Sequence, residues 1–184
     1  MSRGGDPDIL TDFIVPPNTT VDGNFFTFKG FRVILNTSLS VFKVVKASKA
    51  EFPALEGQSV SYAVLEFPGG SINPPHTHPR SAELLFTLDG FLQVGFVDTT
   101  NKLFTQTLQA GDMFVFPKGL VHFQHNVDPQ KPALAISAFG SASAGTVSIP
   151  TTLFNTTIDD TVLALAFKTD VATIQTLKKA FATS

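Results

Sequence analysis

All four histidines of the chain lie within two short segments, and a fold that uses them together must bring these segments to one place. The first segment holds His76 and His78, with Glu83 five residues after the second histidine. The second segment holds His122 and His125. Residues two apart on an extended strand point to the same face, so His76 and His78 would present their imidazoles together. Imidazole and carboxylate groups suit a divalent metal, for which Glu83 and His122 are the third and fourth donors.

The glycines and the proline around these residues decide between a metal site and an incidental cluster. An H-x-H pair alone is more often surface polarity or a satisfied hydrogen bond. Here Gly70 precedes the pair by six residues, and Gly90 follows Glu83 by seven. The second segment reads G-x5-P-x-G-x2-H-x3-N between Gly111 and Asn126. Because glycines, proline and donor residues all follow one spacing, the sequence favours metal binding.

Most of the chain up to about residue 149 has the composition of short β-strands. β-branched and aromatic residues dominate seven runs, at 41–45, 60–67, 83–88, 91–97, 103–108, 113–116 and 133–138. Turn residues separate the runs, and Asp89-Gly90 between two of them predicts a hairpin. Many short strands with frequent turns indicate a sandwich or a barrel.

The C-terminal tail changes to helical spacing. We expect helices over residues 159–167 and 170–181, the second with an apolar stripe made of Val171, Ile174, Leu177, Ala180 and Phe181. Thr169 or Asp170 would cap this second helix. Two short helices cannot bury their apolar stripes alone, so we expect them to pack on the barrel or on a neighbouring subunit.

The two histidine segments are the two motifs of the cupin superfamily. The sequence NPPHTHPR at residues 73–80 resembles that of the plant germin-like proteins, and the resemblance extends from Asp6 to near Phe181. It implies an all-β fold, a cupin jelly-roll β-barrel with a short C-terminal helical hairpin. It also implies a secreted, cell-wall (apoplast) protein that forms trimers or hexamers. The implied cofactor is a manganese ion, with the ligands His76, His78, Glu83 and His122.

The length of 184 residues fits one domain with a sizeable core. We interpret residues 1–5 as an added start, 6–149 as the barrel with an N-terminal arm, and 150–184 as a helical extension used in oligomer packing. Many germin-like proteins carry a cysteine pair near the N-terminus, whereas this chain has no cysteine. We therefore expect packing to hold the arm.

The amino-acid composition limits which kinds of partner the chain can have. Hydrophobic residues make up 43% of the chain and charged residues 15%, and 19 residues are Phe. The phenylalanines either fill the barrel core or are partly buried between subunits. A net charge of −2 without a basic cluster argues against a nucleic-acid partner. No apolar run is long enough for a membrane span. Asn18, Asn36 and Asn155 begin N-glycosylation sequons, which agree with secretion.

The reaction depends on the groups beside the metal. Germin-type enzymes that oxidise oxalate use two asparagines there. One matches Asn73, whereas the other position, thirteen residues before His76, is Ala63 here. Alanine donates no hydrogen bond to a bound carboxylate, so the resemblance disfavours oxalate oxidation. Asn73 also suits a turn before Pro-Pro, so its catalytic role stays open. Gln124 should line the cavity with Ala63, whereas His125 should point outward.

Two classes of function stay open. The first is a manganese-dependent oxidoreductase, with superoxide dismutation as the simplest activity and oxidation or cyclisation of a small plant metabolite as the specialised option. The second is a non-catalytic module, auxin-binding by analogy, in which the metal is structural. A barrel of this size holds one small ligand. Imidazole also suits Zn, Fe, Cu and Ni, so manganese rests on the resemblance alone.

Overall fold

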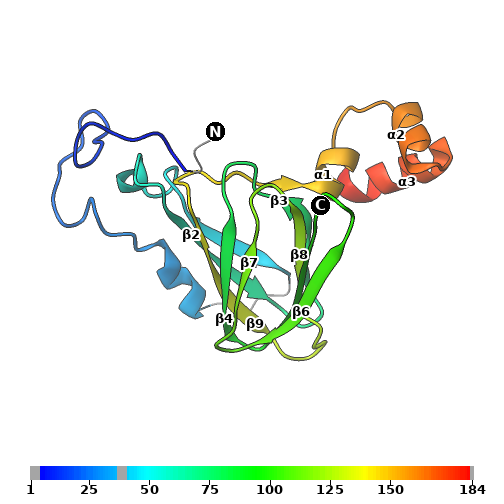
Figure 1. Cartoon of the computed structure of the whole chain (residues 1–184), viewed down its shortest axis with the longest axis horizontal. Coiled ribbons are helices and arrows are strands. Elements are labelled where there is room, and N and C mark those ends of the chain that lie inside the picture. The colour runs from blue at the N-terminus through cyan, green and yellow to red at the C-terminus, as the bar shows by residue number, and fades with distance from the viewer. Residues whose placement is uncertain (1–4, 37–40, 183–184) are drawn as a thin grey trace.

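The computed structural model describes residues 5–36 and 41–182 and has two antiparallel five-stranded β-sheets at its centre. The first sheet has the order β1 (Lys43–Ala47), β2 (Ser61–Phe67), β9 (Ala133–Phe139), β4 (Glu83–Asp89), β7 (Met113–Phe116). The second has the order β10 (Val147–Ser148), β3 (Ile72–Thr77), β8 (Val121–His125), β5 (Phe91–Val97), β6 (Leu103–Gln109). The two sheets enclose a barrel, which confirms the predicted jelly roll (Figure 1).

The barrel core lies between the sheets, and both contribute apolar side chains to it. Leu85 and Phe116 from the first sheet and Leu92 and Val94 from the second are fully buried in one cluster. Each fully buried side chain of this kind stabilises the fold by about 1.5–3 kcal/mol. Alternation along β4 places Glu83, Leu85 and Thr87 inward. The burial of Leu85 in the core therefore fixes the position of β4, the strand that begins with the candidate metal ligand Glu83.

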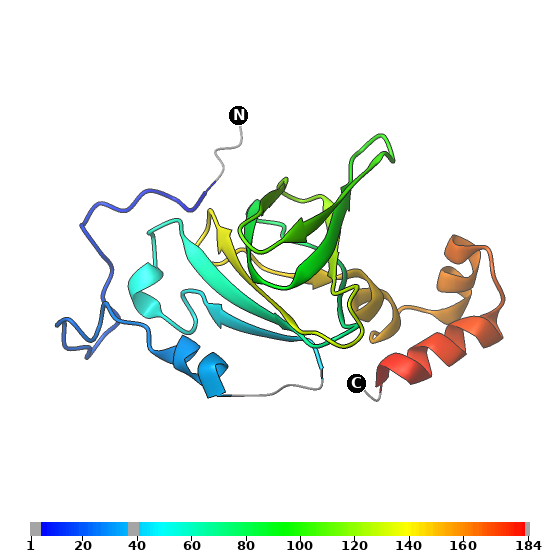
Figure 2. The ribbon, with the colours of Figure 1, turned by 90° about the horizontal axis from the view of Figure 1, so that it is seen from below.

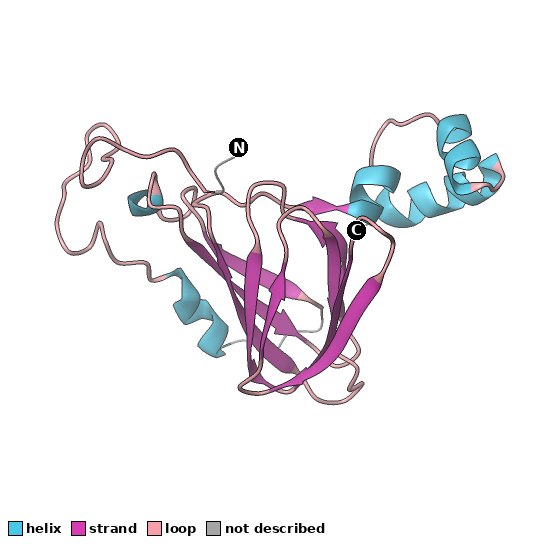
Figure 3. Cartoon of the chain, viewed as in Figure 1, coloured by secondary structure: helices cyan, strands magenta, loops and turns pink. Residues whose placement is uncertain are grey.

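Helices lie on two opposite flanks of the barrel, as Figures 2 and 3 show. The short 3-10 helices η1 (Gly30–Asn36) and η2 (Pro53–Leu55) accompany the N-terminal arm. The other flank carries α1 (Ile149–Phe154), α2 (Asp160–Phe167) and α3 (Val171–Ala182). None of the helices in the described part of the chain has the length and hydropathy to cross a bilayer.

The C-terminal helices pack mainly on one another. Leu163 and Ile174 are buried where α2 and α3 meet, together with Phe154 of α1. Asp159 caps α2 by accepting hydrogen bonds from the backbone of residues 161 and 162, and Asp170 accepts one from the backbone N–H of Thr173. Helix α1 also contacts the barrel, along β3 and β10. The predicted helical hairpin is therefore present, with an additional short helix before it.

The hairpin predicted at Asp89-Gly90 is wrong. Strand β4 pairs with β7 and β9, whereas β5 pairs with β6 and β8, so Gly90 joins two different sheets. Gly90 has a φ of +76°, and a Cβ there would lie 2.7 Å from the carbonyl oxygen of Pro132. The glycine is required at a corner of the barrel, where left-handed backbone and close approach of another segment coincide. A dipeptide signal does not distinguish this corner from a hairpin.

Strands β3 and β8 carry the histidines but were not among the seven predicted runs. Pro74 and Pro75 lie within β3, and prolines normally exclude a strand from a sheet interior because they donate no ladder hydrogen bond. The structure accommodates them with a register shift between Asn73 and His76. Strand β8 has the sequence VHFQH, in which three polar residues of five weaken the apolar pattern that would predict a strand.

The N-terminal arm is tied to the barrel by one carboxylate. Asp6 accepts hydrogen bonds from the hydroxyl of Ser141 and the backbone N–H of Ala142, both at 2.7 Å. Its own backbone N–H donates to Ser59 Oγ at 3.1 Å. These contacts are polar, whereas packing was expected to hold the arm. Of the proposed added start, residues 1–4 lie outside the described residues.

Candidate metal centre

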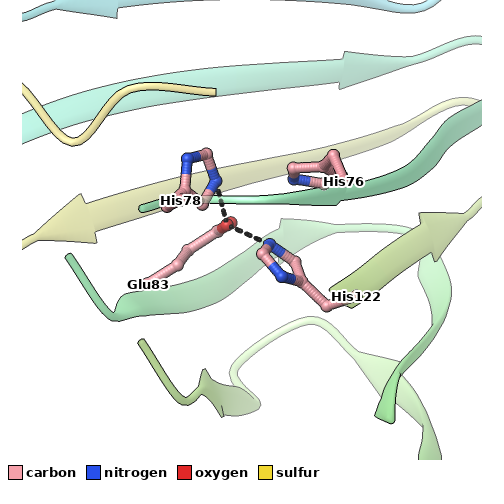
Figure 4. Close-up of side chains that lie close together, drawn as sticks. All are labelled: His76, His78, Glu83 and His122. Atoms are coloured by element: carbon pink, nitrogen blue, oxygen red, sulfur yellow. Dashed lines mark hydrogen bonds and ion pairs between the residues drawn. The ribbon is translucent and has the colours of Figure 1, made fainter. Parts of the chain in front are cut away.

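The structure brings four candidate ligands together inside the barrel. His76 lies near the end of β3, His78 directly follows that strand, Glu83 begins β4, and His122 lies in β8 (Figure 4). All four are buried, and one donor atom from each lies within 4.8 Å of the others. His78 Nε2 and His122 Nε2 are both 3.0 Å from Glu83 Oε2. The arrangement combines segments up to 46 residues apart in the sequence.

The backbone fixes how each imidazole is turned. Nδ1 of His76 lies 2.8 Å from the carbonyl oxygen of Pro74, and Nδ1 of His122 lies 2.8 Å from that of Leu120. Nδ1 of His78 lies 2.5 Å from the carbonyl oxygen of Gly145. A carbonyl oxygen only accepts hydrogen bonds, so each Nδ1 carries a ring hydrogen, and in the neutral ring Nε2 is then the atom with the lone pair. Three lone pairs are therefore available to one ion.

The carboxylate of Glu83 is held from the other side. Ser137 Oγ donates to Glu83 Oε1 at 2.5 Å, and Gln124 Nε2 donates to the same oxygen at 3.2 Å. Both partners are fully buried. Asn73 Nδ2 in turn donates to Gln124 Oε1 at 2.7 Å. These contacts leave Glu83 Oε2 directed at the imidazoles.

The donor set fits a divalent cation. Nε2 of His78 and Nε2 of His122 face Glu83 Oε2 at 3.0 Å, and a neutral imidazole presents a lone pair at this atom, so the group gathers lone pairs around a position that favours a positive charge. A metal ion supplies that charge, and three neutral imidazoles with one carboxylate are a common ligand set for transition metals. Phe116 stacks on the His122 ring at 4.5 Å, which closes one side of the group with apolar surface.

The electrostatics of the group keep His76 and Glu83 in metal-binding protonation states. Burial, together with the neighbouring His122, lowers the pKa of His76 to about 4. Burial alone would raise the pKa of Glu83, but the contacts with His122 and His78 outweigh it and hold that pKa well below its usual range. At neutral pH His76 is therefore neutral and Glu83 is ionised, as metal binding requires.

A cavity of about 430 Å³ opens beside the group. His76, His78 and Glu83 form its inner end, and Asn73 and Ala63 also line it. Its wall continues through the loop at residues 143–146, which Arg80 holds by donating to the carbonyl oxygen of Ser143 at 2.5 Å. A small molecule in this cavity would contact three of the four candidate ligands, His76, His78 and Glu83.

The other predicted site residues are placed as follows. Ala63 lines the cavity, whereas Gln124 is fully buried behind Glu83 and is absent from the cavity wall. Asn73 Nδ2 lies 3.5 Å from His76 Nε2. His125 is half-buried and opposite in direction to its buried neighbours in β8.

The three sequon asparagines lie outside the barrel strands. Asn18 and Asn155 are exposed. Thr37 and Ser38, which complete the sequon of Asn36, lie outside the described residues.

Sequence reasoning missed Ser137 and the three carbonyl groups. Ser137 is the one polar residue in the apolar run ALAISA, and a polar side chain on a buried strand face is informative. This signal could have identified Ser137 from the sequence. The carbonyl partners carry no side-chain signature, because any residue at positions 74, 120 and 145 supplies the same oxygen.

Comparisons with known proteins agree with this geometry. The family model described as Cupin matches residues 35–175. The chain is 64% identical to germin-like protein 9-3 of Oryza sativa subsp. japonica, over 95% of this chain and 85% of that protein. It is 40% identical to germin-like protein subfamily 2 member 4 of Arabidopsis thaliana, over 96% and 88%. A solved structure of an oxalate oxidase superposes with a TM-score of 0.87 at 32% identity, covering 97% of this chain and 99% of the other.

Proposed function

Because the chain belongs to the cupin family and, within it, to the germin-like proteins, we propose that it is a secreted manganese-binding oxidoreductase of the superoxide dismutase type. The observation that carries this proposal is the convergence of three imidazole Nε2 atoms and one carboxylate oxygen within 4.8 Å in a buried site. His76, His78, Glu83 and His122 would hold the metal. When bound, manganese would supply one-electron oxidation and reduction.

The chain's own residues prepare the site for this chemistry. Carbonyl oxygens orient the imidazoles through Nδ1, and Ser137 and Gln124 orient the carboxylate, so little rearrangement is needed on binding. The ligands come from both sheets and the loop after β3, and three of them, His76, His78 and Glu83, also line the cavity. A site with protein ligands on one side and a cavity on the other admits a substrate, as catalytic metal sites do.

Oxalate oxidation is disfavoured although a solved structural relative is an oxalate oxidase. The resemblance implies two amide donors beside the metal, and only Asn73 is present. At the second position the methyl group of Ala63 lines the cavity and donates nothing. Leaving a buried ligand oxygen without its donor costs about 1–3 kcal/mol.

A second candidate is supported by the size of the cavity. About 430 Å³ is within the range of pockets that hold drug-sized ligands and is far more than superoxide requires. This favours oxidation or cyclisation of a small plant metabolite at the same metal, or non-catalytic binding of an auxin-like molecule with the metal as a structural element.

Secretion, glycosylation and oligomerisation belong to the same proposal. The C-terminal extension, residues 150–184, leaves Val162, Leu165 and Leu177 exposed, Leu165 to 75%. Such side chains fit a neighbouring subunit in a trimer or hexamer. Residues 6–149 would then be the cupin barrel with its arm, residues 1–5 an added start, and Asn18, Asn36 and Asn155 the sites of N-glycans.

The proposal is tested by metal analysis together with a superoxide assay. Protein purified and dialysed without added metal should contain about one manganese per chain and scavenge superoxide. His78→Ala and His122→Ala should lose both properties. His125→Ala is the matched control, because this fourth histidine faces away from the group and should change neither. Full metal content in both ligand variants would show that the assignment is wrong. Metal retention without turnover in the wild type would favour the non-catalytic binding module.

A further inference from the structure

Lys46 occupies an unusual position at the metal cavity. In the antiparallel pairing of β1 with β2 it is directly opposite Ala63, and Ala63 is opposite Ser137 of β9. Residues opposite one another across a sheet share a face. Lys46 therefore shares the inward face of Ala63 and Ser137, and both Lys46 and Ala63 line the cavity. The hydroxyl of Ser137 donates to Glu83, and the row continues from Ser137 to Leu85 of β4.

The ammonium group of Lys46 makes no hydrogen bond or ion pair with any residue that the structure describes. The nearby Lys49, by contrast, is paired with Glu56 at 2.9 Å. The carboxylate at the same cavity mouth, Glu51, accepts the hydroxyl and the backbone N–H of Ser48 at 2.5 and 3.0 Å, both on Oε2. Lys46 interacts with Glu51 through charge alone, and since Ser48 occupies Glu51 Oε2, the hydrogen-bond donors of the ammonium group stay available to an anion from solution.

The cavity wall around Lys46 includes apolar side chains. Val44 and Leu65 line the cavity on one side of the Lys46–Ala63 pair, and Phe139, which is paired with Glu83, lines it on the other. The ring of Phe139 meets that of His78 edge to face at 4.8 Å. A flat or compact apolar body fits between the two ends, because it would contact these side chains while its polar groups face Lys46 on one side and the imidazoles on the other.

The sheet geometry sets the length of such a ligand. Neighbouring strands lie about 4.8 Å apart, so Lys46 on β1 and Ser137 on β9, with β2 between them, are separated by about 10 Å at their backbones. A molecule with a ring or a short chain between its two polar ends suits this separation.

We propose that the cavity binds small organic acids whose carboxylate pairs with Lys46 while oxygen donors at their opposite end face His76, His78 and Glu83. This rests on the proposed metal-dependent function, because the oxygen donors need the ion. Ala63 has a defined part: its small side chain leaves room for the ligand beside the lysine stem. A lysine on the edge strand β1 also hinders strand-to-strand association. That role alone predicts no preference for acids.

The test compares two probes that share the oxygen-donor end. 3,4-Dihydroxyphenylacetate carries a carboxylate beyond its ring, and 4-methylcatechol lacks it. Each is titrated calorimetrically into manganese-loaded protein under nitrogen. The wild type should bind the acid about tenfold more tightly or better, as expected for a charge-assisted contact. Lys46→Met should bring the two affinities within about twofold of each other, and Lys46→Arg should restore most of the preference.

Two further variants separate this subsite from the general charge of the surface. Lys49→Met removes an equal charge close by but outside the cavity wall, and the preference should stay as in the wild type. Glu51→Gln removes the carboxylate at the mouth, and the preference should increase because repulsion of the acid decreases. Equal affinities in the wild type, or a preference that survives Lys46→Met, would overturn the inference. So would an equal loss in Lys49→Met.

Metal content measured before each titration distinguishes the two levels of failure. If the wild type contains manganese and scavenges superoxide but does not prefer the acid, only the subsite is wrong. If the wild type takes up no metal, the proposed function and the inference that rests on it both fail.

Discussion

Replacing Ser137 with alanine tests whether the carboxylate of Glu83 is oriented from behind. The hydroxyl of Ser137 is fully buried and donates to Glu83 Oε1 at 2.5 Å, and the other donor to that oxygen, Gln124, is at 3.2 Å. A hydrogen bond to a charged group contributes about 1.5–3 kcal/mol. With 1.4 kcal/mol per factor of ten, Ser137→Ala should weaken metal binding by about 10- to 150-fold. The variant removes one oxygen atom and leaves all four candidate ligands unchanged.

The assay is metal titration against a competing fluorescent chelator at pH 7, with unfolding in denaturant measured in parallel. Ser61→Ala is the matched control. Ser61 is also a buried serine, and it donates to a backbone carbonyl, that of Ser141, at 2.6 Å. This control should lose about 0.5–1.5 kcal/mol of stability and keep its metal affinity. A change in affinity below threefold in Ser137→Ala, or an equal change in Ser61→Ala, would refute the reasoning.

Three further predictions follow from the same structure. Hydrogen peroxide release from oxalate should be negligible in the manganese-loaded wild type and should rise in Ala63→Asn; robust release by the wild type would contradict the role given to this position. In metal-free protein the neutral His76, with a pKa near 4, contributes stability that is fully present above pH 6.5 and is lost as the pH falls toward 4, by about 3 kcal/mol. Denaturant unfolding at both ends of this window, compared with His76→Leu, measures the loss, and an equal pH dependence in the two proteins would exclude it. Deleting residues after Pro150 should yield monomers or aggregates in light scattering, whereas an intact protein that is monomeric at micromolar concentration would refute the proposed assembly.

The barrel was predictable from the sequence because the strands of its core have a simple apolar pattern. The runs at 60–67, 83–88 and 133–138 are apolar and β-branched, and each coincides with an observed strand within one residue at either end. The run at 41–45 was placed two residues early, since β1 spans Lys43–Ala47. Edge strands such as β1 have weaker apolar patterns, so their ends are harder to locate.

Only the part of the candidate site that is formed by side chains was predictable from the sequence. Histidine, glutamate and glycine spacing identified four donors that the structure brings together. The strand that presents His76 was hidden by Pro74 and Pro75, which a sheet accepts only through an irregular register. The position of Lys46 was equally hidden, because a pairing with Ala63 depends on register between strands and not on local sequence.

The tether of the N-terminal arm has a consequence for how the protein is assembled during synthesis. Asp6 leaves the ribosome early, but its partners Ser141 and Ala142 are 135 and 136 residues further along the chain. The carboxylate of Asp6 therefore lacks these two partners until nearly the whole barrel has been translated. The segment that it finally secures leads directly to Gly145, whose carbonyl oxygen turns the His78 imidazole. A residue made before the barrel thus finds its partners only after the barrel, and its docking completes the wall beside the histidines.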